Sequence, residues 1–176
     1  MSDTDAIERP AATWDALQAQ ILAWANRTFP GAGLVSSFTR LREELDEINA
    51  APSDDLEWAD ALMIFLHRAK GYGVSMSSLL DAAAELAPWA QTQTEGEPLG
   101  ATMAILEEWT RVIEEDPEDR ERWHRAFAIY LQAAARAGKT EAHLLAGCQR
   151  KFEIVQKRSW LPPDANGVVR HAKGGK

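Results

Sequence analysis

The sequence predicts an all-α protein, and three observations support this. Alanine, leucine and glutamate are abundant, whereas glycine is scarce outside the joints between segments, a composition typical of helices. Apolar residues recur with the helical period, and the clearest seam is formed by Leu34, Phe38, Leu41, Leu45 and Ile48. The third observation is an internal repeat of a helical hairpin pattern, described below.

Length, charge and cysteine content limit the class of protein. The 176 residues are enough for a single domain over 13–160, which we expect to lie between a flexible leader, 1–12, and a C-terminal tail, 161–176. A net charge of −8 argues against a nucleic acid polymer as partner. Cys148 is the only cysteine, and the chain has neither an apolar signal segment nor a run of 18 apolar residues. We therefore expect a cytoplasmic protein without a membrane partner.

The first predicted helix begins at Thr13 and ends near Arg27, because Pro30 forces the preceding residue into an extended conformation. Trp24, Arg27 and Phe29 gather at this end of the helix. These side chains could hold a nucleobase by stacking. They could equally form a hydrophobic plug on the core.

Two further helices are predicted over 34–49 and 54–72. Pro52 separates them, and Ser53 or Asp54 can cap the second. The short joint lets the two helices fold back antiparallel. We therefore expect side chains on their facing surfaces to converge.

Acidic pairs at helical spacing lie on both of these helices: Glu44 with Glu47, and Glu57 with Asp60. A spacing of three residues brings both carboxylates of a pair onto one helix face. Four oxygen donors that face one another suit Mg²⁺, and also Mn²⁺. A solvated acidic face is the alternative, but Asp60 lies in an apolar segment, where an ionised carboxylate needs a cation or hydrogen-bond donors.

The segment after the hairpin carries weaker signals. His67 falls on the same helix face as Asp60, where it could orient a ligand or serve as a hydrogen-bonded structural residue. Ser75 caps a predicted short helix over 76–86. Pro88 and the polar stretch 91–98 are then expected to form a linker.

The chain repeats itself with a shift of 65 residues, which predicts copy one over about 34–86 and copy two over about 99–151. Two amphipathic hairpins bury their apolar seams best in a four-helix bundle arranged about a pseudo-two-fold axis. One chain would then act as a pseudo-dimer. The residues that recur include Leu41 and Leu106, Ile48 and Ile113, Pro52 and Pro117, Asp54 and Asp119, Trp58 and Trp123, and Gly73 and Gly138.

The acidic residues are the positions that do not repeat. Their equivalents in copy two are Trp109, Val112, Arg122 and Arg125. This difference predicts that only copy one carries the metal chemistry. The two arginines would serve either in packing or in phosphate contact.

A basic end follows copy two in an otherwise acidic chain. Lys151 and Arg158 lie a heptad apart on one predicted helix, just before Trp160. Their cationic side chains suit phosphate oxygens.

The order ExxE then ExxD on paired helices resembles the MazG-like all-α nucleoside triphosphate pyrophosphohydrolases. Five segments look like the dATP/dGTP pyrophosphohydrolase branch: WANRTFP, LREELDEI, DLEWAD, LLAGCQRKFEIVQKRSW and PPDANGVVRH. This chain departs from the branch in having Val155 where Asn is common and Arg40 where His is common.

The resemblance implies hydrolysis of a purine deoxynucleoside triphosphate to the monophosphate and pyrophosphate. Glu44, Glu47, Glu57 and Asp60 would be the catalytic residues: they would hold Mg²⁺, and one of the four would help to deprotonate the attacking water. Lys151 and Arg158 would contact phosphates. Alternatives are a dUTP, dCTP or non-canonical nucleotide pyrophosphatase, or a catalytically inactive helical adaptor. The chain would act as a monomeric pseudo-dimer or assemble into a further homo-oligomer.

Overall fold

The computed structural model describes residues 13–172. The predicted leader, 1–12, lies outside the described residues. The all-α prediction is confirmed, since this part of the chain forms seven helices and no strand beyond one isolated bridge between Trp160 and His171. The helices are α1 (Trp14–Thr28), α2 (Leu34–Ala50), α3 (Asp55–Gly71), α4 (Met76–Thr94), α5 (Leu99–Glu115), α6 (Arg120–Arg136) and α7 (Glu141–Gln156).

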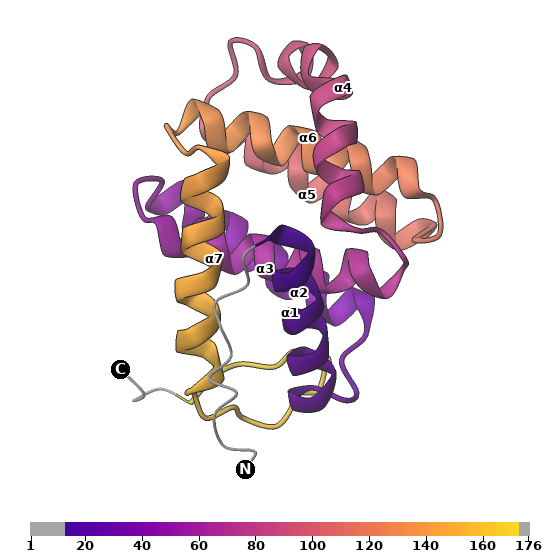
Figure 1. The fold of residues 1–176 in the computed structure, drawn as a ribbon, viewed down its shortest axis with the longest axis vertical. Helices are drawn as coiled ribbons and strands as arrows, with labels where there is room; N and C mark the ends of the chain where they lie inside the picture. The colour runs from indigo at the N-terminus through magenta and orange to yellow at the C-terminus, as the bar shows by residue number, and fades with distance from the viewer. Residues whose placement is uncertain (1–12, 173–176) are drawn as a thin grey trace, which may run out of the picture.

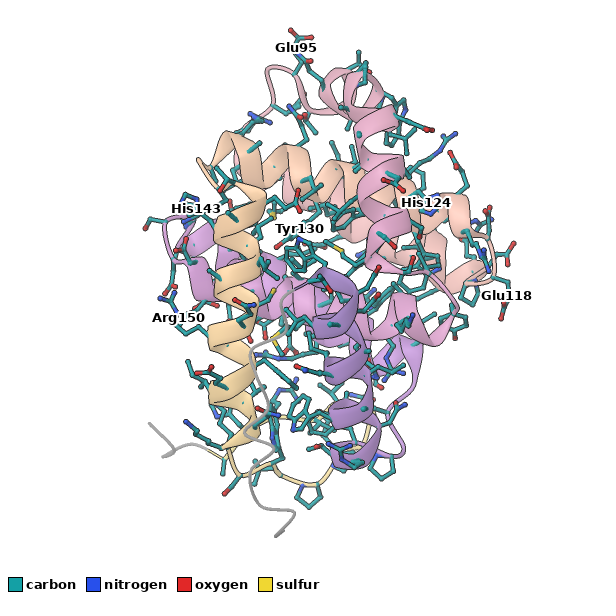
Figure 2. All side chains as sticks on the ribbon, in the orientation of Figure 1. Glu95, Glu118, His124, Tyr130, His143 and Arg150 are labelled. Carbon is teal, nitrogen blue, oxygen red and sulfur yellow. The ribbon has the colours of Figure 1, made fainter. Side chains whose placement is uncertain are left out.

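A four-helix bundle forms the centre of the molecule. The front hairpin, α2 with α3, packs on the rear hairpin, α5 with α6. Between them, Phe65 stacks on Phe127 with ring centroids 6.0 Å apart. The Tyr130 hydroxyl donates a 2.7 Å hydrogen bond to the Trp58 carbonyl, and Figure 2 shows Tyr130 in the interior of the molecule. Burying these apolar seams against each other is the main driving force for the bundle.

The helix bounds follow the sequence repeat. The helices α5, α6 and α7 begin 65 residues after α2, α3 and α4 respectively, and both hairpins are built from helices of 17 residues. The chain therefore builds two tandem hairpins with one backbone plan.

Each hairpin turn is held by the same contacts. Asp54 caps α3 by accepting from the Leu56 N–H at 2.8 Å, and Asp119 caps α6 in the same way at 3.0 Å. The indole N–H of Trp58 donates to the Pro52 carbonyl at 3.0 Å, and Trp123 repeats this bond in the rear hairpin. These caps satisfy backbone donors at the helix starts and fix the return angle of each hairpin.

The helix that follows each hairpin packs on the other hairpin. The helix α4 lies against α6, whereas α7 lies against α3 and faces α1 across the lower half of the molecule (Figure 1). Consequently α7, which follows the rear hairpin in sequence, brings its basic residues to the acidic front hairpin.

The predicted end of α4 is wrong. The helix continues through Pro88 to Thr94 instead of giving way to a linker. Trp89 packs edge-on against Trp109, Ala90 is buried, and the Thr94 hydroxyl donates to the Ala90 carbonyl at 3.1 Å. Packing against the rear hairpin offsets the missing N–H of one proline.

None of the helices within residues 13–172 combines the length and the apolarity that crossing a membrane requires.

Candidate active site

The front hairpin brings three carboxylates together. Glu44 comes from α2, and Glu57 and Asp60 come from consecutive turns of α3. One oxygen from each lies within 4.8 Å of the other two. Three like charges at this separation repel one another, so the cluster is suited to a divalent cation.

Glu44 is the most buried of the three, with 2% of its surface exposed. One oxygen accepts an ion pair from Arg40, while Oε2 is buried and has no hydrogen-bond partner among residues 13–172. Burial and the neighbouring Asp60 raise the pKa of Glu44 to about 9 and outweigh the opposing effect of Arg40. A buried oxygen without a partner, in a group of hard donors, fits the coordination that Mg²⁺ requires.

Asp60 faces Lys151 of α7. The two side chains form an ion pair, and Lys151 is buried. Burial raises the pKa of Asp60, and the Lys151 ammonium opposes that rise. The predicted phosphate-binding lysine therefore pairs with a carboxylate of the acidic cluster in this structure.

Glu47 and Glu57 are the other two predicted acids, and they differ in burial and in their place relative to the cluster. Burial, followed by the contact with Glu47, raises the pKa of Glu57. Glu47 is exposed and lies outside the three-carboxylate cluster, with its carboxylate 3.9 Å from Arg40. The structure thus brings three of the four acids into one cluster and places the fourth at its rim.

A cavity of about 330 Å³ opens beside the acids, a volume suited to a small molecule. Glu44, Glu47 and Asp60 line one part of it. The rest of its wall comes from α1, α2, α3, the end of α7 and the tail; it includes Trp24, Phe29, Ser36, Ser37, Arg40, His67, Arg68, Arg158, Trp160, Arg170 and His171.

Aromatic rings form the apolar wall of this cavity. Trp24 meets Phe29 edge-on at 5.3 Å and Trp160 at 5.9 Å, and Phe29 meets Trp160 at 4.9 Å. Phe152 of α7 packs edge-on against Trp24, with ring centroids 5.7 Å apart. Trp24 and Phe29 therefore pack on other rings and line the cavity as well.

The tail folds back over the same cavity. Trp160 and His171 form an antiparallel bridge, and Arg170 pairs with Glu43 of α2 at 2.7 Å and with Asp164 at 2.6 Å. The yellow segment below α7 in Figure 1 is this tail, and it reaches the lower end of α1.

Residues 17–87 match the model of the dATP/dGTP pyrophosphohydrolase family, which is MazG-like. Over these residues the chain is similar to this family. No curated protein and no solved structure gives a significant match. The family is one of nucleoside triphosphate pyrophosphohydrolases, so the chain falls in that enzyme class. The matched segment runs from α1 into α4 and contains all four acids, whereas Lys151 and Arg158 lie beyond it.

Not every predicted substrate-binding residue lines the cavity. Arg158 does, and its Nε is buried with no hydrogen-bond partner in the described part of the chain. Arg27 is exposed and is not among the lining residues. Lys151 reaches the site only through Asp60.

Arg68 and the two serines Ser36 and Ser37 were not singled out from the sequence. Arg68 lies two helical turns after Asp60, and a spacing of eight residues keeps both side chains on one face of α3. The spacing from Asp60 is therefore the sequence feature that could have identified Arg68 as a site residue. No sequence feature identifies Ser36 and Ser37, because single serines on a helix are common.

The rear hairpin has no comparable cluster. Arg125, the counterpart of Asp60, pairs with Glu121 at 2.9 Å and lies 5.3 Å from the centre of the Trp89 ring. Trp109, the counterpart of Glu44, packs edge-on against Trp89 at 5.9 Å. Arg122 pairs with Asp119 at 3.3 Å. Both arginines therefore make ion pairs with residues of the rear hairpin, and Arg125 also packs on Trp89 of α4.

Proposed function

We propose that the chain is a Mg²⁺-dependent pyrophosphohydrolase of purine deoxynucleoside triphosphates, which releases the monophosphate and pyrophosphate. The observation that carries the proposal is the three-carboxylate cluster with its unpartnered Glu44 oxygen, at the edge of a cavity walled by aromatic rings. Mn²⁺ is compatible with the same donors.

Glu44, Glu57 and Asp60 would hold the ion. When bound, Mg²⁺ supplies charge neutralisation at phosphate oxygens and lowers the pKa of a bound water. Glu47 lines the cavity outside the cluster, so it is the carboxylate best placed to accept a proton from the attacking water. This assigns separate roles to the buried and the exposed acids.

Cations around the cluster would receive the triphosphate. Arg158 lines the cavity with a buried, unpartnered Nε. Arg40 and Lys151 pair with Glu44 and Asp60 in this structure. A divalent ion would compete for those carboxylates, and both cations would then be released to contact phosphate oxygens.

The rear hairpin would take the place of a second subunit. It supplies the packing partner of the front hairpin, and the chain then returns through α7 with Lys151 and Arg158. We propose one active site per chain, completed by a helix that crosses the pseudo-two-fold axis.

Pyrophosphate release from a panel of nucleotides tests the function. We expect release from dATP or dGTP with Mg²⁺ or Mn²⁺, little with dCTP or dUTP, and none after chelation with EDTA. Preferred hydrolysis of dCTP, dUTP or a damaged nucleotide would correct the substrate class. A folded protein that hydrolyses no member of the panel with either ion would instead support the inactive adaptor.

A further inference from the structure

One arginine of the cavity lies away from the acids. Arg68 follows Asp60 by eight residues on α3, a rise of about 12 Å along the helix. Both residues line the same cavity. A triphosphate held at Asp60 would therefore extend its nucleoside toward Arg68.

The partners of Arg68 are uncharged. Its Nε donates to the Ser37 hydroxyl at 2.7 Å, and Nη2 donates to the Ala32 carbonyl at 2.8 Å. Among residues 13–172 no carboxylate forms an ion pair with it, and Nη1 has no hydrogen-bond acceptor there. Burial lowers the pKa of Arg68 without abolishing its charge. The side chain thus holds a fixed orientation and keeps donor capacity at the cavity wall.

The surroundings of Arg68 suit a flat ring. Ala32, which Arg68 contacts, is itself bonded to Phe29: its N–H donates to the Phe29 carbonyl at 3.1 Å. The Phe29 ring packs on Trp160 at the apolar wall. Burial and Arg68 lower the pKa of His67, the preceding residue on α3, to about 4, so this imidazole is neutral at pH 7. Arg68 is therefore a charged side chain next to an uncharged imidazole, and both line the cavity.

Assuming the proposed function, we infer that Arg68 reads the six-position edge of the purine and selects guanine over adenine. The guanidinium would donate to O6 and N7 of guanine, both of which are acceptors. Adenine presents an amino donor at the six position, so the same guanidinium would face a donor there. The expected preference for dGTP over dATP is about 10-fold to 100-fold in kcat/KM.

Base analogues test the inference in the unmodified protein. dITP keeps O6 and N7 but lacks the two-amino group, whereas the 2-aminopurine deoxynucleoside triphosphate keeps that amino group but lacks O6. We expect dITP to be hydrolysed like dGTP, and 2-aminopurine to be hydrolysed like dATP. Equal kcat/KM values for dGTP and dATP, or a preference that follows the two-amino group, would overturn the inference.

Arg68→Gln tests the residue itself. A glutamine amide matches the N6 and N7 pair of adenine, so the dGTP to dATP ratio should fall to about one or invert. The matched control is Arg136→Gln, because Arg136 also donates to a backbone carbonyl of another segment, that of Thr94 at the end of α4, at 2.9 Å, but does not line the cavity. Its ratio should stay at the unmodified value.

Two outcomes separate the possible failures. An equal loss with every base would assign Arg68 to the triphosphate and overturn the inference while leaving the proposed function intact. If no nucleotide is hydrolysed at all, the proposed function fails. Tryptophan fluorescence titration with non-hydrolysable dGTP and dATP analogues would then still test base selection directly.

Arg68→Lys replaces Arg68→Gln if the glutamine variant does not fold, because lysine keeps the charge but loses the planar guanidinium. An unchanged dGTP to dATP ratio in Arg68→Lys would also count against the inference.

Discussion

The front and rear hairpins share a backbone plan and differ at four acidic positions. Both have helices of 17 residues, an aspartate cap and a tryptophan bonded to the carbonyl of the turn proline. In the front hairpin the equivalent face gathers three carboxylates. In the rear hairpin it is filled by Trp109, Arg125 and Trp89 of α4.

This difference shows that the acids are not needed to build the hairpin. Burial raises the pKa values of Glu44, Glu57 and Asp60, and neighbouring carboxylates raise those of Glu44 and Glu57 further. Ionising the cluster is therefore unfavourable in the fold. The rear hairpin reaches the same fold with side chains that simply pack. The acidic cluster is therefore best explained by ligand binding rather than by stability.

The largest expected effect comes from exchanging one acid for its amide. Asp60→Asn should lower kcat/KM about 1,000-fold, because the amide cannot supply an anionic ligand to the ion. Pyrophosphate release measures this loss, and far-UV circular dichroism should show unchanged helicity.

The counterpart Arg125→Asn is the matched control in the rear hairpin. Its activity should stay within about twofold of the unmodified value, since surface-proximal changes away from a site have small effects. Equal losses in both variants would break the distinction between the two hairpins.

His67 gives the front hairpin a pH dependence of stability that its rear counterpart, Gln132, does not have. Its pKa in the fold is about 4 and its ordinary value is 6.5, so the folded state binds fewer protons than the unfolded state. The stabilisation is present above pH 6.5 and is lost as the pH falls toward 4, by about 3 kcal/mol. Urea unfolding at a series of pH values measures it.

His67→Gln should remove this part of the pH dependence. Carboxylates titrate in the lower part of the same range, so the informative quantity is the difference between the two proteins. Parallel curves for both proteins would show that His67 is accessible to protons in the fold.

Mg²⁺ binding at the front hairpin should raise the free energy of unfolding of the protein. Mg²⁺ at 100 times its dissociation constant should stabilise the protein by about 2.7 kcal/mol, which a thermal melt detects without any substrate. Glu44→Gln should abolish this increase, because it removes the most buried carboxylate of the cluster. A full Mg²⁺ response in Glu44→Gln would mean that the ion binds elsewhere.

Trp109→Ala, in the rear hairpin, should lower stability and leave activity unchanged, the reverse of what we expect for Asp60→Asn. The substitution removes the ring that packs on Trp89 and should destabilise the protein by about 2 kcal/mol. Turnover at 25 °C should be unchanged. A loss of activity in the still-folded variant would implicate the rear hairpin in catalysis.

The sequence predicted the paired helices well, because their information is local and repeated. The turn proline, the capping aspartate and the apolar seam all recur 65 residues later, so each prediction was made twice. The course of α4 through Pro88 was missed. It depends on Trp89, Ala90 and Thr94 meeting the rear hairpin, which no local pattern records.

The acidic pairs could be read from spacing, and so could the pairing of Arg40 with Glu44, four residues later on α2. The pairing of Lys151 with Asp60 could not, because Lys151 comes from α7 and only the folded chain brings the two side chains together. Glu47 and Arg27 were predicted in the site, but both side chains are exposed, Glu47 outside the carboxylate cluster and Arg27 outside the cavity lining. Helical spacing gives the face on which a side chain lies but not how deeply it is buried. The return of the tail to α2 through Arg170 and Glu43 is likewise a long-range contact.

The number of nucleotide sites per chain tests the central claim most directly. Isothermal titration with a non-hydrolysable dGTP analogue in the presence of Mg²⁺ should give one site per chain, absent in Asp60→Asn and retained in Arg125→Asn. Two equivalent sites per chain, or binding that survives Asp60→Asn but not Arg125→Asn, would contradict the assignment of the chemistry to the front hairpin.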